Sequence, residues 1–568
     1  MKKNWKIKQN SQSEKHSEGM FSDLEPVIAK ILINRGICDE ETKRVFFDSD
    51  YDQDLHDPFL LSGMEEAVAR ILSAREKKEK VCIYGDYDAD GVTSATLLKD
   101  FFNQIGIESF CYIPDRNREG YGFNENAINY IKNQKAKLVV SVDCGISNFS
   151  EVEGANLDKL DIVILDHHHV PEKIPNAVAV VDPKKDGEKY PFKDLAGVGV
   201  AFKFIQAVAS KIDEFDEQKL KWFLDLVAIG TIADCVPLLG ENRVLVKYGL
   251  VVLAKTKRVG LKQIFNVGRV AIDENNFPSS QQVAFQIAPR INAAGRMDHA
   301  NTAFNLLACK NGEEPEARVL ALEIEDQNQH RQKVTKQIID EVEKEIGAIE
   351  EADKIIIASS PHWELGVVGL AAGKITDKYN RPSILLKEKD DGILTGSCRS
   401  IPKFSIIEAL EKHKDLFEKY GGHDQAAGLS IKKERFEEFK KIMNEEVSAI
   451  LPEEIIKLIE IDAEIDSVEI NEKIARELSM LEPFGAGNQP PVFYAKNLEI
   501  IDKKLVGKTG AHMKLWFKRE KGILEAIGFG LGEKYTEIKI GDKIEAVFNI
   551  EEDSWNGNKK LQLKLIDF

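Results

Sequence analysis

Three short apolar segments in the first half of the chain each stop at an acidic residue. The segments are Val81-Cys82-Ile83-Tyr84, Leu138-Val139-Val140-Ser141-Val142 and Ile162-Val163-Ile164-Leu165. Short segments that are rich in β-branched side chains and precede helical patterns are typical of buried parallel strands. Ligands bind beyond the carboxyl ends of such strands in an open α/β sheet, so we expect the acidic residues to converge on one crevice.

The pattern of apolar and polar positions changes along the chain, and the changes predict separate parts. The sequence over 313–350 is charged and almost free of Gly and Pro, which predicts one long helix that bridges two α/β domains. The predicted parts are a lead segment, 1–62; an α/β domain, 63–312; the bridging helix, 313–350; a second α/β domain, 351–452; and a β-rich domain, 456–568.

The second α/β domain is predicted to begin with a strand at Lys354-Ile355-Ile356-Ile357-Ala358. A helix over Gly366–Tyr379 and a strand over Pro382–Leu386 follow, and Gly-rich turns are expected at Gly396 and Gly421-Gly422.

A linker is predicted at Leu451-Pro452, and short strands with turns follow it. The expected strands are Pro491–Tyr494, His512–Phe517, Gly522–Gly528, Lys543–Phe548 and Lys560–Ile566. This pattern favours a small β-barrel of the OB-fold type.

Composition limits the classes of function. A chain of 568 residues is too long for one core, and no stretch of about 18 apolar residues predicts a membrane span. The formal net charge of −17 argues against a protein that coats nucleic acid, but nucleic acid can still be a substrate because phosphate binding depends on local cations. The seven cysteines form no Cys-x-x-Cys pair, and the N-terminus lacks the apolar core of a signal peptide, so we expect a cytoplasmic location.

Acidic and imidazole side chains follow each of the three predicted strands. The loop Asp86-Tyr87-Asp88-Ala89-Asp90-Gly91 alternates carboxylates before a glycine that permits a sharp turn; alone, it is equally consistent with an acidic turn in which Asp90 caps a helix. Asp143 and Asp166-His167-His168 hold the equivalent positions after their own strands. Packing these anions together is costly unless cations neutralise them, so the set predicts a site for two divalent ions.

A fourth contribution is expected from Asp234, which follows an apolar helix that should end at Gly230. On its own Asp234 is more typical of a cap or a turn, and only the other ligands favour a metal role. Carboxylate and imidazole ligands without a well-placed thiolate suit manganese or magnesium better than zinc. Two such ions activate a water and stabilise an in-line displacement at phosphorus, which predicts phosphoryl chemistry.

Four segments combine glycines with basic or polar side chains that suit phosphates. They contain Arg116, in Pro114–Gly122; Arg290, in Pro289–Arg296; Ser397 and Arg399, in Thr395–Ser400; and His423, in Gly421–Gly428. Each alone is equally typical of a structural turn. The segment Gly197-Val198-Gly199 resembles part of a dinucleotide-binding loop but lacks the third glycine and an acidic ribose ligand, so no nucleotide cofactor is expected.

These motifs resemble those of the DHH phosphoesterase superfamily. The resemblance rests on Asp86 to Gly91, Asp143, Asp166-His167-His168 and Asp234, and Gly396-Ser397-Cys398-Arg399-Ser400 and Gly421-Gly422-His423 resemble its DHHA1-type second domain. Pro483-Phe484-Gly485-Ala486-Gly487-Asn488-Gln489-Pro490 and the β-rich tail are similar to the RecJ family of single-strand-specific 5′→3′ DNA exonucleases. The resemblance implies an α/β fold with DHH and DHHA1 domains joined by a long helix, plus a C-terminal OB-fold.

The resemblance also implies roles for individual residues. The metal ligands would be Asp88, Asp90, Asp143, His167 and Asp234, with Asp143 bridging two Mn²⁺ or Mg²⁺ ions. The catalytic residues would be Asp86 beside the metals, His168 against the scissile phosphate and Asp166 as support for the histidines. The terminal phosphate of the substrate would be held by Arg116, Arg290, Ser397 and Arg399, and His423 would contact substrate near the metals.

The implied activity is metal-dependent hydrolysis of single-stranded DNA from the 5′ end to mononucleotides, in DNA repair and recombination. The OB-fold would hold the strand downstream. Single-strand-binding protein and a helicase are candidate partners, and the chain is expected to be a monomer that does not bind membranes.

Two alternatives remain. One is a DHH enzyme on short substrates, such as an oligoribonuclease, a nucleotide phosphatase or a pyrophosphatase, and the long helix and β-rich tail count against it. The other is a degenerate relative that acts as a scaffold, although every ligand position is filled. One departure from the family pattern is Glu364, which stands where a histidine is usual, and no role is assigned to it.

Overall fold

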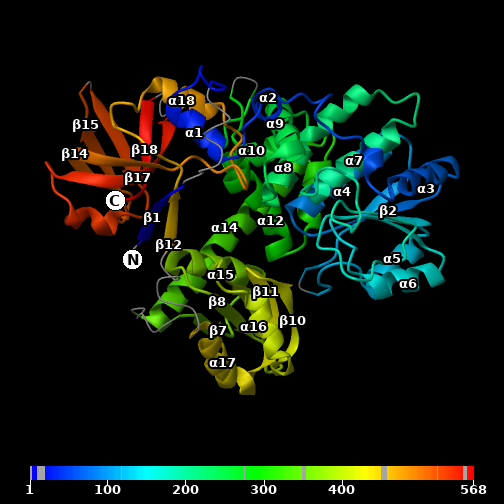
Figure 1. Cartoon of the computed structure of the whole chain (residues 1–568). Helices are drawn as coiled ribbons and strands as arrows, with labels where there is room; N and C mark the ends of the chain where they lie inside the picture. The colour runs from blue at the N-terminus through cyan, green and yellow to red at the C-terminus, as the bar shows by residue number, and fades with distance from the viewer. Residues whose placement is uncertain are drawn as a thin grey trace. The chain divides into compact units, whose positions relative to one another are not determined.

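The structure is a computed structural model that describes residues 3–8, 19–116, 118–273, 276–347, 354–448, 457–520, 522–553 and 560–568. The chain has two compact units, whose elements are labelled in Figure 1. The larger unit comprises residues 56–236 and 245–457, and the barrel unit comprises 1–55, 237–244 and 458–568. The linker predicted at Leu451-Pro452 lies outside the described residues.

A five-stranded parallel sheet begins the larger unit, as the apolar segments predict. Its strands lie in the order β3 (Ser109–Tyr112), β2 (Val81–Gly85), β4 (Leu138–Val142), β5 (Asp161–Leu165) and β6 (Ala179–Val181). The helices of this part are α3 (Met64–Glu76), α4 (Ala89–Gln104), α5 (Glu125–Asn133) and α6 (Phe149–Leu157). Every residue of β2 and β4 is buried, which explains why their sequences are apolar without alternation.

Strands and helices alternate only as far as β6, whereas the sequence pattern predicts alternation from about residue 63 to about residue 310. The following helices are α7 (Gly197–Ala209), α8 (Leu224–Ala233), α9 (Gly240–Ala254), α10 (Val259–Gly268), α12 (Ala288–Met297) and α13 (Asn301–Ala308). Nearly every residue of α7 and α8 is buried, and both helices pack on α4. Helices that are apolar on all sides resemble buried strands in sequence, which is the reason for the difference.

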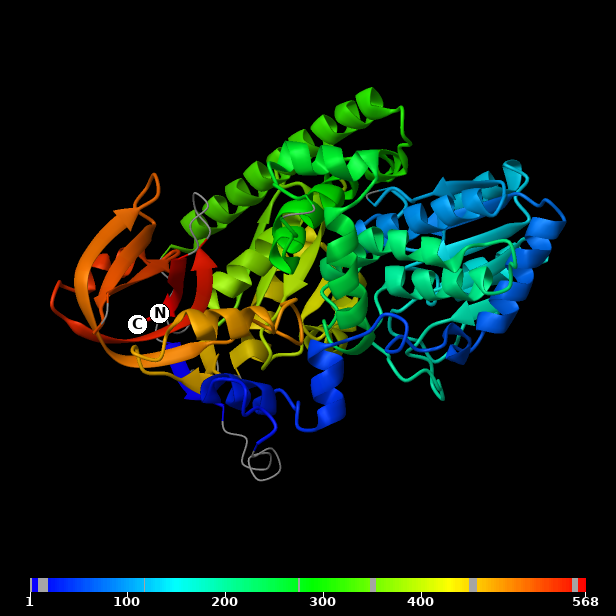
Figure 2. The ribbon, with the colours of Figure 1, turned by 90° about the horizontal axis from the view of Figure 1, so that it is seen from above.

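The predicted bridging helix is confirmed as α14 (Glu314–Ile346), the long green helix of Figure 2. Its 33 residues span about 50 Å at 1.5 Å per residue. It packs on α10, α12 and α13 of the first domain and on α15 of the second. Val334, Ile338 and Val342 enter the core of the second domain, while Leu322 is 54% exposed.

The second domain is built on a mixed five-stranded sheet. The strands lie in the order β10 (Phe417–His423), β11 (Ala426–Lys432), β9 (Ile393–Arg399), β8 (Ser383–Glu388) and β7 (Ile356–Ser360). The helices are α15 (Leu365–Tyr379), α16 (Ile406–Lys412) and α17 (Phe436–Ser448).

The turns expected at Gly396 and Gly421-Gly422 are wrong, because these glycines lie inside β9 and β10. A Cβ atom on Gly396 would come within 2.0 Å of the carbonyl oxygen of Leu385, so the glycine serves close strand packing.

The barrel unit contains the predicted OB-fold. Its five main strands are β14 (Phe493–Val506), β15 (His512–Lys518), β16 (Ile523–Gly528), β17 (Lys543–Asp553) and β18 (Lys560–Asp567). They pair in a closed ring, β14–β15–β16–β18–β17 and back to β14, in which only β16 and β18 are parallel.

The N-terminal part of the chain shares a hydrophobic core with this barrel. Ile28, Ile31 and Leu32 of α1 (Pro26–Asn34) are buried in one cluster with Phe493 and Phe548. The remaining elements are β1 (Lys3–Ile7), which pairs with β12 (Lys457–Ile461); α2 (Glu40–Phe47); β13 (Ala463–Glu464); and α18 (Glu472–Ser479). The lead segment up to Leu55 and the β-rich tail therefore belong to one folded body, although they lie at opposite ends of the sequence.

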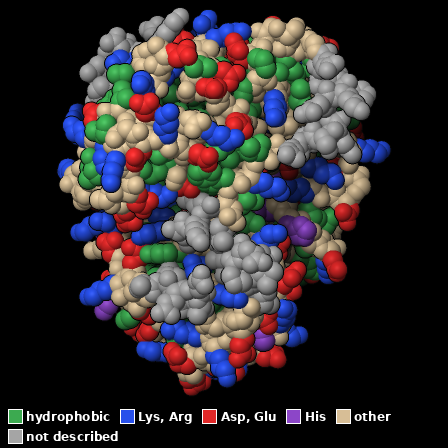
Figure 3. All heavy atoms as spheres, turned by 60° about the vertical axis from the view of Figure 1, so that its left-hand side comes forward, with side chains coloured by type: hydrophobic (Ala, Val, Ile, Leu, Met, Phe, Trp, Pro, Cys, Tyr) green, Lys and Arg blue, Asp and Glu red, His purple; other side chains and the backbone are tan. Residues whose placement is uncertain are grey.

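Charged side chains of both signs are interspersed over the surface shown in Figure 3. Within the described ranges, no helix combines the length and apolar character that a membrane span requires.

Candidate active site

The acidic residues lie where the sheet of the larger unit changes direction. The chain passes from β2 outward to β3 and then returns to β4, which lies on the other side of β2. Asp86 follows β2 and Asp143 follows β4, so the two carboxylates flank this switch point, and Asp166 follows β5 next to it. Open parallel sheets bind their ligands at such a point, as the sequence pattern predicts here.

The predicted metal ligands lie close enough together to bind the same cations. The Nε2 atom of His167 is 3.1 Å from Asp143 Oδ1, 3.7 Å from Asp234 Oδ2 and 3.9 Å from Asp90 Oδ2. Ligand atoms fall within 4.8 Å of one another in three groups: Asp90, His167 and Asp234; Asp86, Asp88 and Asp143; and Asp143, His167 and His168. Asp143 and His167 each belong to two groups, an arrangement that suits two neighbouring ions.

Several polar atoms of this cluster are buried without a hydrogen bond. They are Asp86 Oδ1, Asp143 Oδ1 and both ring nitrogens of His167. An unpartnered buried carboxylate is expensive, and divalent cations would satisfy the two carboxylate oxygens and the Nε2 atom of His167 that faces the carboxylates. The residues therefore fit two hard divalent cations, and the absence of cysteine from the three groups favours Mn²⁺ or Mg²⁺ over zinc.

The electrostatics of the cluster agree with a site built for cations. Burial and the neighbouring carboxylates raise the pKa of Asp86, Asp90 and Asp143 well above the usual range. Burial, and then Asp88, raise the pKa of Asp234 to about 7. Burial lowers the pKa of His167 to about 3, so this imidazole is a neutral ligand at physiological pH.

Backbone amides hold two of the carboxylates in place. Asp88 Oδ1 accepts hydrogen bonds from the amides of Asp90 and Gly91, so Asp88, and not Asp90, caps α4. Asp90 accepts hydrogen bonds from the amides of Gly197 and Val198, at 2.7 and 2.8 Å. The segment that resembles a dinucleotide loop is thus the amino end of α7, and its amides orient a predicted metal ligand.

Three glycines let the segments around the carboxylates pack closely, and none of them serves a sharp turn. A Cβ atom on Gly91 would lie 2.5 Å from the carbonyl oxygen of Asp86, and one on Gly197 would lie 2.7 Å from the Cβ of Asp143. One on Gly230 would lie 2.5 Å from Thr93 Oγ1. The expectation that a helix ends at Gly230 is wrong, because α8 continues to Ala233 and Gly230 lets it approach α4.

The backbone of Asp143 is strained, with φ of 61° in the left-handed region. Such a conformation costs a non-glycine residue about 1–3 kcal/mol, so the surrounding structure must hold it in place. Tyr121 supports it, since its hydroxyl donates to the Asp143 carbonyl at 3.1 Å and lies 3.1 Å from His168 Nδ1. Tyr121 was not selected from the sequence, because a single tyrosine in a loop carries no signal of its own.

Asp166 accepts hydrogen bonds from both histidines. Its Oδ1 lies 2.8 Å from His168 Nδ1 and accepts the amide of His167, and its Oδ2 accepts the amide of Ile146. Burial opposes a charge on His168, but the hydrogen bond to Asp166 and the charges of Asp166, Asp234 and Asp86 together outweigh it and raise the pKa of His168 to about 9. Because Nδ1 already faces Asp166 and Tyr121, Nε2 is the ring nitrogen left for a ligand.

A cluster of arginines lies beside the carboxylates and is contributed by both domains. Burial and then the charge of Arg116 lower the pKa of Arg296 to about 10, with Arg331 and Arg399 nearby. Arg399 donates to Ser397 Oγ at 2.7 Å, so these two predicted residues lie together. Arg296 lies in the predicted segment Pro289–Arg296 but was not selected from it, and Arg331 was missed because it lies on a helix that carries no phosphate motif.

Arg290, the fourth predicted phosphate ligand, has other partners. Its Nε donates to Glu325 Oε2 at 2.7 Å, and its guanidinium also donates to the carbonyl of Gln286. The Gly-rich turn expected over 289–296 is wrong, since these residues form the helix α12. Arg290 therefore faces α14, while Arg296 points from the same helix to the arginine cluster.

His423 lies at the exposed end of β10, in register with the arginine cluster. It is opposite Ala426 of β11, which is opposite Arg399 of β9. Neighbouring strands lie about 4.8 Å apart, so the backbones of His423 and Arg399 are about 10 Å apart.

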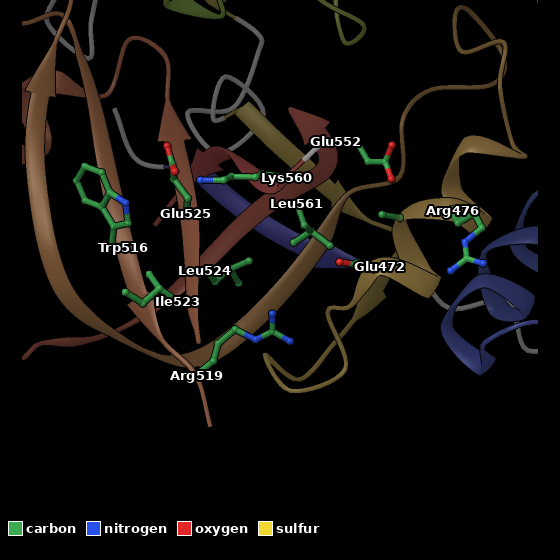
Figure 4. A pocket seen from close by; sticks show the side chains of 11 residues that line it. Glu472, Arg476, Trp516, Arg519, Ile523, Leu524, Glu525, Glu552, Lys560 and Leu561 are labelled. Atoms are coloured by element: carbon green, nitrogen blue, oxygen red, sulfur yellow. The ribbon is translucent and has the colours of Figure 1, made fainter. Parts of the chain in front are cut away.

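The barrel unit has its own candidate nucleic-acid surface, shown in Figure 4. A cavity of about 720 Å³ lies between α18 and the outer face of β15, β16 and β18. Trp516 points outward because its neighbours Leu515 and Phe517 are buried in the barrel. Three basic side chains, Arg476, Arg519 and Lys560, are balanced by Glu472, Glu525 and Glu552 in the lining.

Comparison with protein families matches three segments of the chain. Residues 80–231 match the DHH family N-terminal domain, residues 352–449 the DHHA1 domain and residues 461–567 the RecJ OB domain.

Whole-chain relatives agree with these matches. The chain is 37% identical over its whole length to the single-stranded-DNA-specific exonuclease RecJ of Bacillus subtilis, of which it covers 71%. It is 34% identical to RecJ of Haemophilus influenzae, over 90% of this chain and 91% of that protein. The Mn²⁺ complex of RecJ from Thermus thermophilus superposes with a TM-score of 0.82 at 26% identity, over 99% of this chain and 79% of that one. The three matched segments and the identity over the whole chain agree, and the chain belongs to the RecJ family of DHH phosphoesterases.

Proposed function

We propose that the chain is an exonuclease that hydrolyses single-stranded DNA from its 5′ end to mononucleotides, using two Mn²⁺ or Mg²⁺ ions. The observation that carries the proposal is the pair of opposite clusters in the larger unit: buried carboxylates with unpartnered oxygens beside arginines from both domains. One cluster fits metal ions, and the other fits the phosphates of a strand.

The proposed ligands are Asp88, Asp90, Asp143, His167 and Asp234, with Asp86 beside them. When bound, the ions supply a nucleophilic water at neutral pH and stabilise the charge that develops on the phosphate. Asp88 and Asp90 are oriented by backbone amides, and Asp166 holds the ring of His168 in place through its Nδ1 atom. His168 Nε2 then presents a proton to a phosphate oxygen, since the raised pKa keeps this imidazole charged.

The 5′ polarity is proposed to come from the arginine cluster. Arg116, Arg296, Arg331 and Arg399, with Ser397, would hold a terminal phosphate so that the next phosphodiester lies at the metals. Arginine donates bidentate hydrogen bonds to phosphate, which fixes orientation as well as position. His423, in register with Arg399, is placed to contact the strand beside this end pocket.

The barrel is proposed to hold the strand by stacking. The cavity in Figure 4 has balanced charges, so attraction to phosphates is weak there, and the half-buried ring of Trp516, which lines the cavity, is the feature that suits a base. A short-substrate enzyme would have no use for this surface, which counts against the alternative reading.

Degradation of single-stranded DNA labelled at either end tests the proposal. With Mn²⁺ or Mg²⁺ added, a 5′ label should appear at once in mononucleotides, and a 3′ label should stay in shortening strands. Release of the 3′ label first would contradict the polarity, and no release with either metal would contradict the activity.

The role of the barrel is tested by Trp516→Ala rather than by truncation. Deleting residues from 456 onward would expose Ile28, Ile31 and Leu32, which share the core of the barrel. Loss of one stacked base should weaken binding to long single strands by roughly 1–3 kcal/mol. Unchanged affinity for a long strand would remove Trp516 from the proposed path.

The biological setting is proposed from the family alone. DNA repair and recombination, a cytoplasmic location, action as a monomer, and single-strand-binding protein and a helicase as partners are expectations that co-purification and sizing in solution can test.

A further inference from the structure

Three arginines line a cavity in the larger unit that the proposed reaction does not use. The cavity has a volume of about 880 Å³ and is lined by residues of α10, α12 and α14. Its basic groups are Arg269, just after α10, Arg290 on α12 and Arg318 on α14. Among the described lining residues Glu325 is the one carboxylate, so the cavity is locally positive in a chain of net charge −17.

Arg290 is a fixed part of this cavity. Its side chain is 12% exposed and forms an ion pair with Glu325, which is 17% exposed, at 2.7 Å. The missing side chain of Gly268 makes room for it, because a Cβ atom there would lie 3.3 Å from the guanidinium carbon. A guanidinium that is held in this way loses little entropy on binding an anion.

Arg269 and Arg318 are free to bind. Both are exposed, and in the described part of the chain neither guanidinium has a hydrogen-bonding or ion-pair partner. Arg318 lies on the same face of α14 as Leu322, Glu325 and Gln329, at the spacing that aligns side chains along a helix. Two free guanidiniums and one fixed guanidinium around a concavity suit a group with several anionic oxygens.

The cavity is electrostatically continuous with the arginine cluster of the active site. Burial and then the charge of Arg290 lower the pKa of Arg331, and Arg331 in turn lies near Arg296. Cationic groups therefore lead from the end pocket along α12 and α14 to the cavity.

We propose that this cavity is a second anion site, distinct from the end pocket, that binds a phosphate monoester. A monoester carries up to two charges where a phosphodiester carries one, and its three terminal oxygens can meet several arginines. The volume lies within the range of small-molecule sites, and Gln263, Asn266 and Gln329 offer hydrogen bonds to a sugar or base. The 5′-mononucleotide released by the reaction is the ligand we infer, and this identity alone rests on the proposed function.

Binding of 5′-dAMP to the full chain by calorimetry, in EDTA and without DNA, tests the site. Two binding events are expected in the wild type. Arg269→Gln with Arg318→Gln should weaken one of them at least tenfold, which equals about 1.4 kcal/mol, and leave the other. Arg399→Ala should do the reverse. Lys336→Gln is the matched control, because it removes one charge from α14 outside the cavity and should change neither event.

Three further ligands identify the source of the anion. Deoxyadenosine should not bind. Inorganic phosphate that binds as tightly as 5′-dAMP would keep the anion site and make free phosphate its ligand. The proposal would be overturned in favour of a strand path if a 5′-hydroxyl oligothymidylate binds through Arg269 and Arg318 and 5′-dAMP does not. It would also be overturned if the double variant leaves both binding events of 5′-dAMP unchanged. If the chain binds 5′-dAMP at this site but does not degrade DNA, the proposed function would be contradicted and the anion site would be kept.

Discussion

A cluster of carboxylates and a cluster of arginines lie side by side in the larger unit, and the fold builds the two clusters in different ways. The carboxylates come mainly from the ends of neighbouring strands of one sheet, are buried, and have raised pKa values. The arginines come from a loop, two helices and a strand of two domains, and burial lowers the pKa values of Arg296, Arg331 and Arg399. Each cluster is costly alone, so one requires cations and the other requires an anion. A phosphate ester bound to metal ions meets both requirements.

The largest effect is expected when the carboxylate cluster loses its shared member. Asp143→Ala should abolish turnover while leaving the fold intact, because the lost anion relieves repulsion from its neighbours. Asp143→Asn is the companion variant, since asparagine tolerates positive φ better than alanine does. Turnover is measured on labelled single strands, and melting is measured in EDTA. Near-normal turnover in either variant would rule out Asp143 as the ligand shared by two ions.

A smaller effect is expected from pH in the absence of metal. The folded pKa of Asp234, about 7, lies above its ordinary value, so the folded state binds more protons than the unfolded state between about pH 4 and 7. Its contribution to stability is present below this window and is lost as pH rises through 7. Between pH 5 and 7 the loss should be about 2–3 kcal/mol.

Melting in EDTA at pH 5 and pH 7.5 measures this loss. Asp234→Asn should show a smaller fall than the wild type, and Mn²⁺ should protect the wild type more at the higher pH. An equal fall in both proteins would assign the pH dependence to other groups.

A substitution in the arginine cluster should change the preference for a 5′-phosphate about tenfold. Arg399→Lys keeps the charge but loses the bidentate geometry, so the preference for 5′-phosphorylated over 5′-hydroxyl strands should fall about tenfold, or about 1.4 kcal/mol. The measurement is kcat/KM on the two substrates, with metal binding unchanged. Arg435→Lys is the control, because Arg435 lies in the same domain and pairs with Glu438 at the surface. An unaltered ratio in Arg399→Lys would place the end pocket elsewhere.

The smallest effect is expected from a charge pair outside both clusters. Glu364 lies 3.2 Å from His330 Nε2, and both side chains are about half exposed. Glu364→Gln should change stability by about 0–1 kcal/mol, as exposed pairs do, and should leave the 5′-phosphate preference as it is. A large loss of turnover in this variant would extend the active site to the start of α15.

Within each cluster, the residues differ in how far the sequence revealed them. Asp86, Asp143 and Asp166-His167-His168 could be located because a buried parallel strand has a recognisable apolar run, and its carboxyl end is the residue that follows. Arg296 could not be distinguished from Arg290, since both lie in one short segment. Which of them faces the cluster depends on the rotation of α12 against α14, a property of packing.

By itself, the sequence determined the parallel sheet, the long helix and the barrel, and it supplied the candidates for the metal ligands. These follow from local periodicity and from side-chain chemistry, which neighbouring residues largely decide. Only the tertiary structure decided that Gly91, Gly197 and Gly230 serve close packing, that Tyr121 supports Asp143, and that the first residues of the chain complete the core of the last domain. These features join residues that are distant in the chain, and contacts of that kind are set by how the elements pack together rather than by local sequence.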